Sequence, residues 1–189
     1  MIKGLTLIVG GARGGKSSYA QDLAAGTGEG VLFVATASAD DEEMRRRIEK
    51  HRLSRPDSWR TLETTSHLAR RIGEEIREEK VVLIDCITLL VNNVIAEIPD
   101  MDEELPSEDL LQEKVTEEIG ALIEYIEGSD ARFIIVTNEV GLGLVPANEL
   151  GRLYRDILGR ANQQLARHAD EVYLMVCGLP LLLKTRGPG

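Results

Sequence analysis

The sequence predicts an α/β fold, in which a mostly parallel β-sheet carries helices on both faces. Short runs of apolar, β-branched residues alternate with helix-length segments along the chain, which is typical of parallel strands joined by right-handed helical crossovers. The runs are continuously apolar over four or five residues, which favours strands covered on both faces. The expected strands are residues 5–9, 31–35, 81–84, 132–136 and 172–176.

Helices are expected between these strands. The clearest covers residues 150–165, where apolar side chains recur at helical spacing on one stripe: Leu150, Leu153, Tyr154, Ile157, Leu158, Ala161 and Leu165. A helix is also expected to begin at Lys16. Ser107 can start another helix after a loop-like break near residues 99–107.

The length of 189 residues suits one domain, expected over residues 1–186, with residues 187–189 as a disordered tail. The chain holds 32 acidic against 22 basic residues, a net charge of −10. An acidic chain without polybasic clusters is a poor partner for nucleic acid or for an anionic membrane surface. The composition therefore favours small-molecule substrates.

The apolar stretches and the cysteines indicate a cytoplasmic protein. The longest apolar stretch, residues 179–183, is far shorter than the about 20 residues of a membrane-spanning helix. We expect no signal peptide ahead of the first strand. Cys86 and Cys177 are interpreted as small core residues in a reducing compartment.

The charges are unevenly distributed. Residues 97–118 hold ten acids against one base, whereas residues 44–60 hold seven bases against two acids. A solvated helix face accounts for the acidic run. The basic run has a local net charge of +5 (seven minus two), which is compatible with phosphate binding as well as with a solvated helix face.

The strongest motif follows the first expected strand and matches G-x-x-x-x-G-K-[ST], the phosphate-binding loop (P-loop). Backbone N–H groups of such a loop surround phosphate oxygens, and the following helix N-terminus adds positive charge. Lys16 is expected to reach the β- and γ-phosphates, and the Ser17 hydroxyl to bind Mg²⁺. The nucleotide-binding residues predicted here are Gly10, Gly11, Ala12, Arg13, Gly14, Gly15, Lys16 and Ser17.

A P-loop needs an acid beside its metal, and Asp85 follows the strand at residues 81–84. From this position a carboxylate can hold Mg²⁺ directly or through water, although acids also end strands as helix caps. Thr36 and residues 137–139 follow strands in the same way. Ligands of open parallel sheets collect at the carboxyl ends of the strands, so these groups should face one crevice.

His51 admits two interpretations. It shares a helical face with Met44 and Ile48, which is typical of a histidine packed on an amphipathic helix. Its basic neighbours could instead hold a phosphate beside a nucleophilic neutral imidazole. His67 and His168 lie near expected helix ends and are interpreted as structural.

Several longer motifs resemble the bifunctional adenosylcobinamide kinase/adenosylcobinamide-phosphate guanylyltransferase family over about residues 5–184. They are the P-loop, Val34-Ala35-Thr36, Asp41–Met44 with Arg47-Ile48 and His51-Arg52, Arg55-Pro56 with Trp59, Thr61 and Glu63, Asp85–Thr88 with Asn92, Thr137–Gly141 with Val145-Pro146, Arg155-Asp156 with Gly159-Arg160 and Asn162-Gln163, and Ala169–Val172. The His51 segment and Thr137–Gly141 make the match specific. Gly14 stands where the family often has Ser.

The resemblance implies two reactions on a RecA-like core. A nucleoside triphosphate phosphorylates adenosylcobinamide, and GMP then passes from GTP through a histidine, here His51, to adenosylcobinamide phosphate. It also implies Mg²⁺ and a homotrimer. By position it assigns nucleotide contacts to Ala35, Thr36, Ala37, Arg52, Leu53, Ser54, Arg55, Glu63 and Asp85.

Two other functions fit the P-loop alone. One is a monofunctional kinase for a small alcohol, in which His51 is purely structural. The other is a nucleotide-gated switch or RecA-like ATPase acting on a protein partner. Covalent guanylylation separates the first from the bifunctional enzyme, and stimulation of hydrolysis by a macromolecule would favour the second.

Overall fold

A computed structural model describes residues 3–37, 55–98 and 107–185 of the chain. Its strands form a seven-stranded sheet in the order β3-β2-β4-β5-β1-β6-β7. All neighbouring pairs are parallel except β6 and β7, which are antiparallel. The strands are β1 (Gly4–Gly10), β2 (Val31–Ala35), β3 (Arg60–Glu63), β4 (Val81–Asp85), β5 (Arg132–Val136), β6 (Glu171–Val176) and β7 (Leu179–Lys184).

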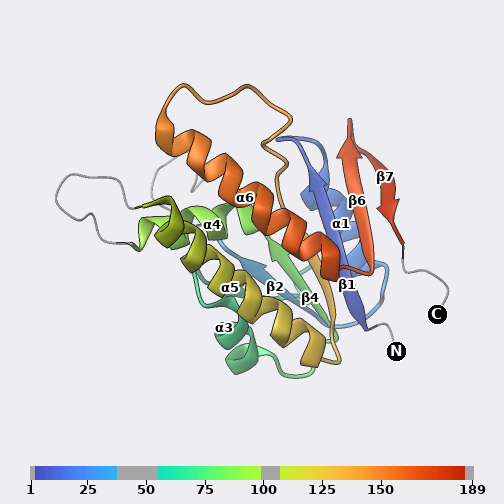
Figure 1. The fold of residues 1–189 in the computed structure, drawn as a ribbon. Helices are drawn as coiled ribbons and strands as arrows, with labels where there is room; N and C mark the ends of the chain where they lie inside the picture. Colours follow the sequence, from blue (N-terminus) through green and yellow to red (C-terminus); the bar gives the residue numbers. More distant parts are fainter. Residues whose placement is uncertain (1–2, 38–54, 99–106, 186–189) are drawn as a thin grey trace.

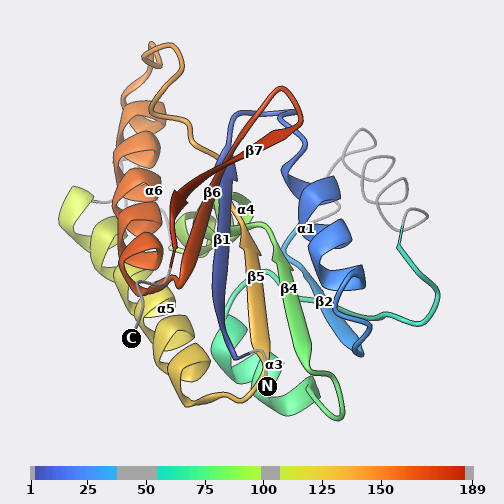
Figure 2. The same ribbon diagram turned by 90° about the vertical axis from the view of Figure 1, so that its right-hand side faces the viewer.

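The helices of the described segments cover the two faces unequally (Figures 1 and 2). α1 (Lys16–Ala25) packs on one face, and we call this the α1 face. The other face carries α3 (Leu68–Glu75), α4 (Ile87–Ala96), α5 (Glu108–Gly128) and α6 (Glu149–His168). Each helix except α1 buries an apolar stripe in the larger core.

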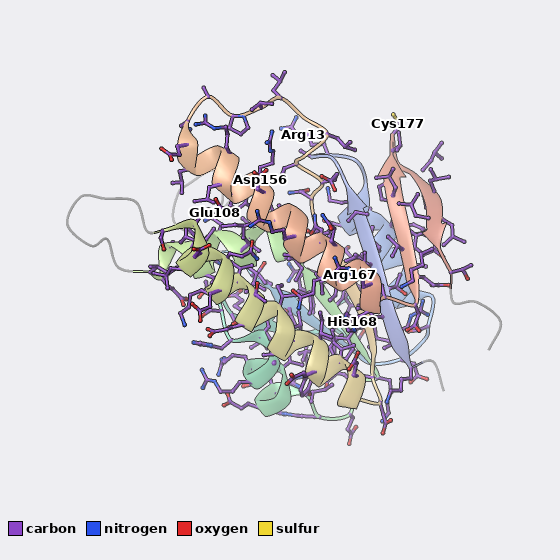
Figure 3. The ribbon with its side chains drawn as sticks, in the orientation of Figure 1. Arg13, Glu108, Asp156, Arg167, His168 and Cys177 are labelled. Carbon is purple, nitrogen blue, oxygen red and sulfur yellow. The ribbon has the colours of Figure 1, made fainter. Side chains whose placement is uncertain are left out.

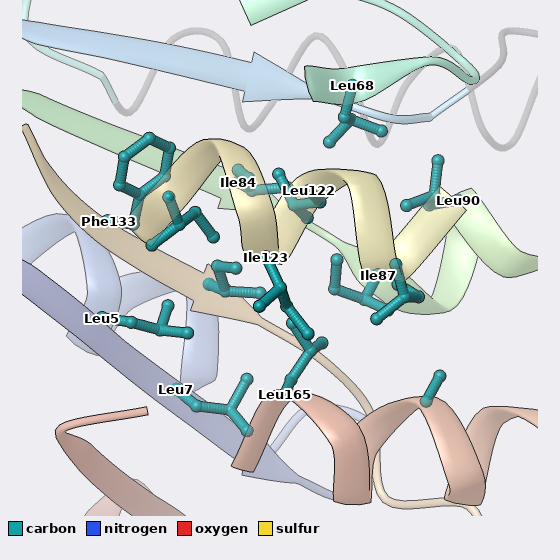
Figure 4. Close-up of a cluster of buried hydrophobic side chains, with 14 of the residues drawn as sticks. Leu5, Leu7, Leu68, Ile84, Ile87, Leu90, Leu122, Ile123, Phe133 and Leu165 are labelled. Carbon is teal, nitrogen blue, oxygen red and sulfur yellow. The ribbon is translucent and has the colours of Figure 1, made fainter. Parts of the chain in front are cut away.

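Strand alternation divides the core into two clusters. In β1, Leu5, Leu7 and Val9 pack against α5 and α6, whereas Ile8 faces α1. The larger cluster surrounds fully buried side chains such as Phe133, which is shown in Figure 4. Truncating a buried leucine of this cluster, such as Leu7, to alanine typically costs about 2–5 kcal/mol, so the cluster contributes much of the stability of the fold.

The structure confirms the predicted mostly parallel sheet and its five strands, with ends shifted by at most one residue. α1 begins at Lys16 as expected, and the helix predicted at 150–165 extends to Glu149–His168. Ser107 caps α5: its side chain accepts a hydrogen bond from the Leu110 N–H. The residues between 99 and 106 lie outside the described segments.

Two strands were missed and one cysteine was misplaced. β3 carries charged residues at both ends and so lacks the pattern of a buried strand, whereas β7 has a leucine-rich composition but is exposed along its length. Cys177 is exposed, because it forms the β6–β7 turn with Gly178; both residues have positive φ, 53° and 82°. Its interpretation as a core residue was wrong. No helix in the described ranges is long and apolar enough to cross a membrane.

Candidate nucleotide-binding site

Residues predicted from the sequence meet at the carboxyl edge of the sheet. Glu63, Ala35 and Asp85 stand side by side on β3, β2 and β4, and Asp85 in turn pairs with Val136 of β5. Val81, Leu83 and Ala35 belong to the core cluster under α1. Because side chains alternate along a strand, Asp85 also projects toward the α1 face. Leu62 belongs to the opposite cluster, so Glu63 projects toward the α1 face as well.

The P-loop connects β1 to α1 over this edge. Gly10 and Gly15 have φ of 153° and 92°, and a Cβ on Gly10 would lie 2.7 Å from the Met175 carbonyl oxygen. The Gly14 N–H donates to the Gly11 carbonyl oxygen at 3.1 Å, which closes the turn. Because the loop passes this close to β6, only glycine fits at position 10 without strain.

Gly14 also has little room for a side chain. An added Cβ would lie 3.0 Å from the Gly11 carbonyl oxygen and 3.3 Å from the Met175 carbonyl oxygen. The Gly178 N–H donates to the Gly14 carbonyl oxygen at 3.2 Å. The β6–β7 turn therefore supports the P-loop from the side. Figure 3 shows Arg13 of the loop and Cys177 of the turn at the same end of the molecule.

Lys16 and Ser17 open α1 at the α1 face. The Lys16 side chain bends back over the loop, and its Nζ donates to the Gly11 carbonyl oxygen at 2.7 Å. Only 7% of Lys16 is exposed, so the ammonium group lies inside the turn where phosphate oxygens would lie.

Ser17 and Asp85 are suited to Mg²⁺. Mg²⁺ takes oxygen ligands and is usually held by one or two protein groups together with water and phosphates. A hydroxyl at the start of α1 and a carboxylate on the same face supply this set. Among the described residues there is no cluster of three or more His, Cys, Asp or Glu that could hold a metal. Such an ion would therefore depend on nucleotide phosphates for most of its coordination.

Arg55 lies on the α1 face beside β2. Its guanidinium carbon stands 3.5 Å from the centre of the Phe33 ring, and one guanidinium nitrogen donates to the Thr61 hydroxyl at 3.4 Å. Phe33 is buried among the side chains under α1. Stacking on an aromatic ring holds a guanidinium flat, so Arg55 keeps a positive charge near the row of strand ends.

Thr36 and Cys86 fasten the ends of β2 and β4 together. The Thr36 hydroxyl donates to the Cys86 carbonyl oxygen at 2.7 Å and accepts from the Cys86 N–H at 2.8 Å. The predicted nucleotide contact Thr36 thus has its hydroxyl committed to backbone, while Ala37 beside it is partly exposed. Burial raises the pKa of the Cys86 thiol to about 11; the Asp85 carboxylate adds to the rise and Lys16 opposes it.

A buried polar network supports the end of β5 from the opposite face. The Thr137 hydroxyl donates to Asn162 Oδ1 at 2.7 Å, and Asn162 Nδ2 donates to the Asn138 carbonyl oxygen at 2.9 Å. The Asn138 N–H donates to the Thr88 hydroxyl at 2.8 Å. The Tyr154 hydroxyl donates to the Thr88 carbonyl oxygen at 2.8 Å, and burial raises the pKa of Tyr154.

From their position after a strand, Thr137 and Asn138 were expected at the site, whereas Thr88, Tyr154 and Asn162 were given no role in supporting it. Tyr154 was placed on an apolar stripe, and its stripe position is consistent with its partly buried ring. The signal that could have been used is the phenol itself, because a buried tyrosine usually finds a hydrogen-bond partner.

The predicted His51, Arg52, Leu53 and Ser54 lie outside the described residues. The other two histidines have structural partners: His67 precedes α3 and lies 3.8 Å from a carboxylate oxygen of Glu118, and His168 contacts Glu127 at 2.8 Å near the far end of α6. This agrees with their structural interpretation.

A parallel sheet with a P-loop between β1 and α1, and an acid at the end of β4 on the same face, defines a nucleotide-binding protein of the P-loop class. Residues 6–183 match the family described as cobinamide kinase/cobinamide phosphate guanyltransferase. The chain belongs to this family.

Curated relatives named as bifunctional adenosylcobalamin biosynthesis proteins align with this chain over nearly their whole length. The bifunctional adenosylcobalamin biosynthesis protein CobU of Escherichia coli is 41% identical over 181 residues, which are 95% of this chain and 99% of that protein. The Pseudomonas aeruginosa protein CobP is 42% identical over 178 residues, 94% of this chain and 96% of its own. Among solved structures, the RadB recombinase aligns with a TM-score of 0.46 at 13% identity, covering 90% of this chain and 73% of that one.

Proposed function

We propose that this enzyme phosphorylates adenosylcobinamide and then guanylylates the resulting phosphate. Membership of the cobinamide kinase/guanyltransferase family supports both reactions. The observation that carries the proposal is the shared face: Lys16 and Ser17 of α1 and Asp85 of β4 lie on the α1 face, with Arg55 nearby.

In the kinase step, the backbone N–H groups of residues 10–17 bind the phosphates of the nucleoside triphosphate. Lys16 turns from the Gly11 carbonyl oxygen to the β- and γ-phosphates, where its charge matters most as the γ-phosphoryl group leaves. Ser17 and Asp85 would hold Mg²⁺, which when bound supplies neutralisation of polyphosphate charge.

In the transferase step, a His51 imidazole nitrogen attacks the α-phosphorus of GTP. The bond from that phosphorus to the bridging oxygen breaks, and pyrophosphate leaves with the electron pair. A phosphate oxygen of adenosylcobinamide phosphate then attacks the same phosphorus and displaces the histidine nitrogen, which gives adenosylcobinamide-GDP. Arg52 and Arg55 offset the charge on the leaving pyrophosphate, and Ala35–Ala37, Leu53, Ser54 and Glu63 complete the nucleotide contacts.

Labelling with GTP tests the transferase step. Wild type incubated with α-labelled GTP should retain acid-labile covalent label after denaturation, and His51→Ala should retain none. His168→Ala is the matched control, because that histidine pairs with Glu127 near the far end of α6. Wild-type protein without label but with kinase activity would instead establish a monofunctional kinase.

A homotrimer in the cytoplasm is the assembly and location we propose for this chain. β7 supports an assembly: Leu179, Leu181 and Leu183 are 71%, 55% and 57% exposed on a sheet edge, and exposed apolar edges tend to be covered. Sedimentation equilibrium should give three times the 20.8 kDa chain mass. Leu181→Asp should lower that mass, and an unchanged trimer would move the interface away from β7.

A further inference from the structure

Residues beyond the end of β5 run directly alongside the P-loop. The Thr137 N–H donates to the Ile8 carbonyl oxygen at 3.0 Å, and the Glu139 N–H donates to the Gly10 carbonyl oxygen at 3.0 Å. The β5–β1 pairing therefore continues past β5 to the first glycine of the loop. Glu139 stands opposite the point where the phosphates would begin.

Three carboxylates, those of Glu63, Asp85 and Glu139, lie at or just beyond strand ends at this edge. The spacing of the strands gives the distance of each one from β1. Neighbouring strands lie about 4.8 Å apart. In the sheet order, Glu139 is next to β1 at about 5 Å, Asp85 is two strands away at about 10 Å, and Glu63 is four strands away at about 19 Å. Glu139 is thus the carboxylate nearest to the strand that carries the P-loop.

The carboxylate of Glu139 is oriented but not neutralised. Its Oε1 accepts a hydrogen bond from the Gly141 N–H at 2.9 Å, while none of the described residues makes a hydrogen bond or ion pair with Oε2. The residue is half-buried. The polar network of Thr137, Asn138 and Asn162 fixes the backbone just before it, so one oxygen remains available in a defined place.

Glu139 and Asp85 both lie at the carboxyl edge of the sheet, beyond β5 and at the end of the neighbouring β4. Thr137, two residues before Glu139, points to Asn162 of α6, and Val140 packs against the larger core cluster. Asp85 projects toward α1, where the metal and the β-phosphate are expected. In-line phosphoryl transfer requires the attacking hydroxyl to approach from the side away from the leaving phosphate. A base for that hydroxyl has to lie beside the P-loop, as Glu139 does.

We infer that Glu139 is the general base of the kinase reaction; this rests on the kinase half of the proposed function. Oε2 accepts the proton of the acceptor hydroxyl as its oxygen bonds to the γ-phosphorus. The bond from that phosphorus to the β,γ-bridging oxygen breaks, and the nucleoside diphosphate leaves with the electron pair. Asp85 is assigned to Mg²⁺ and Glu63 is too distant, so neither competes for this proton.

The loop after Glu139 suits a large acceptor that carries the hydroxyl on a mainly hydrocarbon frame. Leu142, Leu144 and Val145 are 80%, 96% and 65% exposed in this loop, beside a site that is otherwise polar. A corrinoid alcohol could contact these side chains while its hydroxyl reaches Oε2. A small hydrophilic alcohol would gain nothing from them.

Two variants of Glu139 test the inference in the full-length enzyme. Glu139→Gln keeps the acceptor oxygen for Gly141 but cannot take a proton, so kcat for phosphorylation of adenosylcobinamide should fall at least about 100-fold. The KM for the nucleotide should change by less than about threefold. Glu139→Ala should be equally slow and should recover activity when formate is added as an external base. Glu149→Gln, an exposed glutamate at the start of α6, is the matched control and should keep wild-type kcat.

The outcomes are distinguishable from failure of the proposed function. A wild-type enzyme unable to phosphorylate adenosylcobinamide would overturn the kinase assignment and the role of Glu139 with it. Active wild type together with a Glu139→Gln variant above one-third of its kcat would overturn the base alone. A slow, folded Glu139→Ala that formate does not accelerate would also count against proton transfer.

Discussion

The strand-end site consists of residues 10–17, 85–88 and 137–139, and it adjoins the C-terminal hairpin of β6 and β7. The two regions meet where Gly10 pairs with Met175 of β6 and where the Gly178 N–H donates to the Gly14 carbonyl oxygen. In the strand-end site, the Thr88 and Thr137 hydroxyls have internal partners, and Gly10 and Gly14 lie close against backbone. β7 instead exposes its leucines along its whole length. One region holds its polar groups in a fixed arrangement, whereas the other exposes a row of apolar side chains.

The largest effect is expected from removing the Lys16 charge from the strand-end site. Lys16→Ala should lower kinase turnover about a thousandfold, equivalent to about 4 kcal/mol of transition-state stabilisation. The fold should persist, because a hydrogen bond from a charged group, such as the one to the Gly11 carbonyl oxygen, contributes about 1.5–3 kcal/mol, less than the stability of a typical domain. Steady-state kinetics and thermal unfolding measure the two effects. Lys3→Ala, at a surface ion pair of 3.9 Å, is the control and should change neither.

Retained phosphorylation in Lys16→Ala would mean that residues 10–17 do not bind the transferred phosphate. The hairpin would then have to be reconsidered as part of a different site. Loss of folding in the same variant would instead show that the lysine is a structural element of the loop.

The second prediction tests the rigid contact between the two regions. Gly10→Ala places a Cβ 2.7 Å from the Met175 carbonyl oxygen of β6 at a φ of 153°, so it should lower the free energy of unfolding by about 3 kcal/mol. Gly120→Ala is the matched control in the middle of α5, where a Cβ meets no atom within 4 Å. It should raise stability by about 0.5–1 kcal/mol. Urea unfolding of both variants measures the difference, and equal effects would show that the loop is not held against β6.

The same contrast explains what could be predicted from the sequence. The strand-end site was predictable because its chemistry is local: a glycine pattern follows an apolar run, and Asp85 follows another. The continuous apolar runs likewise predicted five strands. β7 was not predictable, because an exposed leucine-rich strand has the composition of a buried one and lacks the alternation that would mark one face.

The supporting network shows the other limit. Asn162 reaches Thr137 across 25 positions and Tyr154 reaches Thr88 across 66, so their pairing depends on how α6 docks on the sheet. Helical spacing predicted that α6 would be amphipathic. It did not indicate which polar side chain on the buried stripe would meet the end of β5, because that is decided by the packing of the two elements.

The last comparison concerns the alkylation rates of the two cysteines, Cys86 in the strand-end site and Cys177 in the hairpin. At pH 8 a thiol with a pKa of about 11, such as Cys86, is about 0.1% thiolate, and the thiolate is the form that iodoacetamide attacks. Cys177 is exposed at the hairpin tip (Figure 3) and should be alkylated first, with Cys86 at least about 100-fold slower. Mass spectrometry of timed samples measures both rates, and Cys177→Ser should leave only the slow one.

The thiol of Cys86 also links stability to pH. Its pKa is raised above the ordinary 9.0 by burial, so the unfolded chain releases this proton first as the pH rises. The contribution is therefore complete below about pH 9 and is lost as the pH approaches 11, by about 2 kcal/mol. The difference in unfolding free energy between wild type and Cys86→Ala should shrink between pH 8 and 10.5.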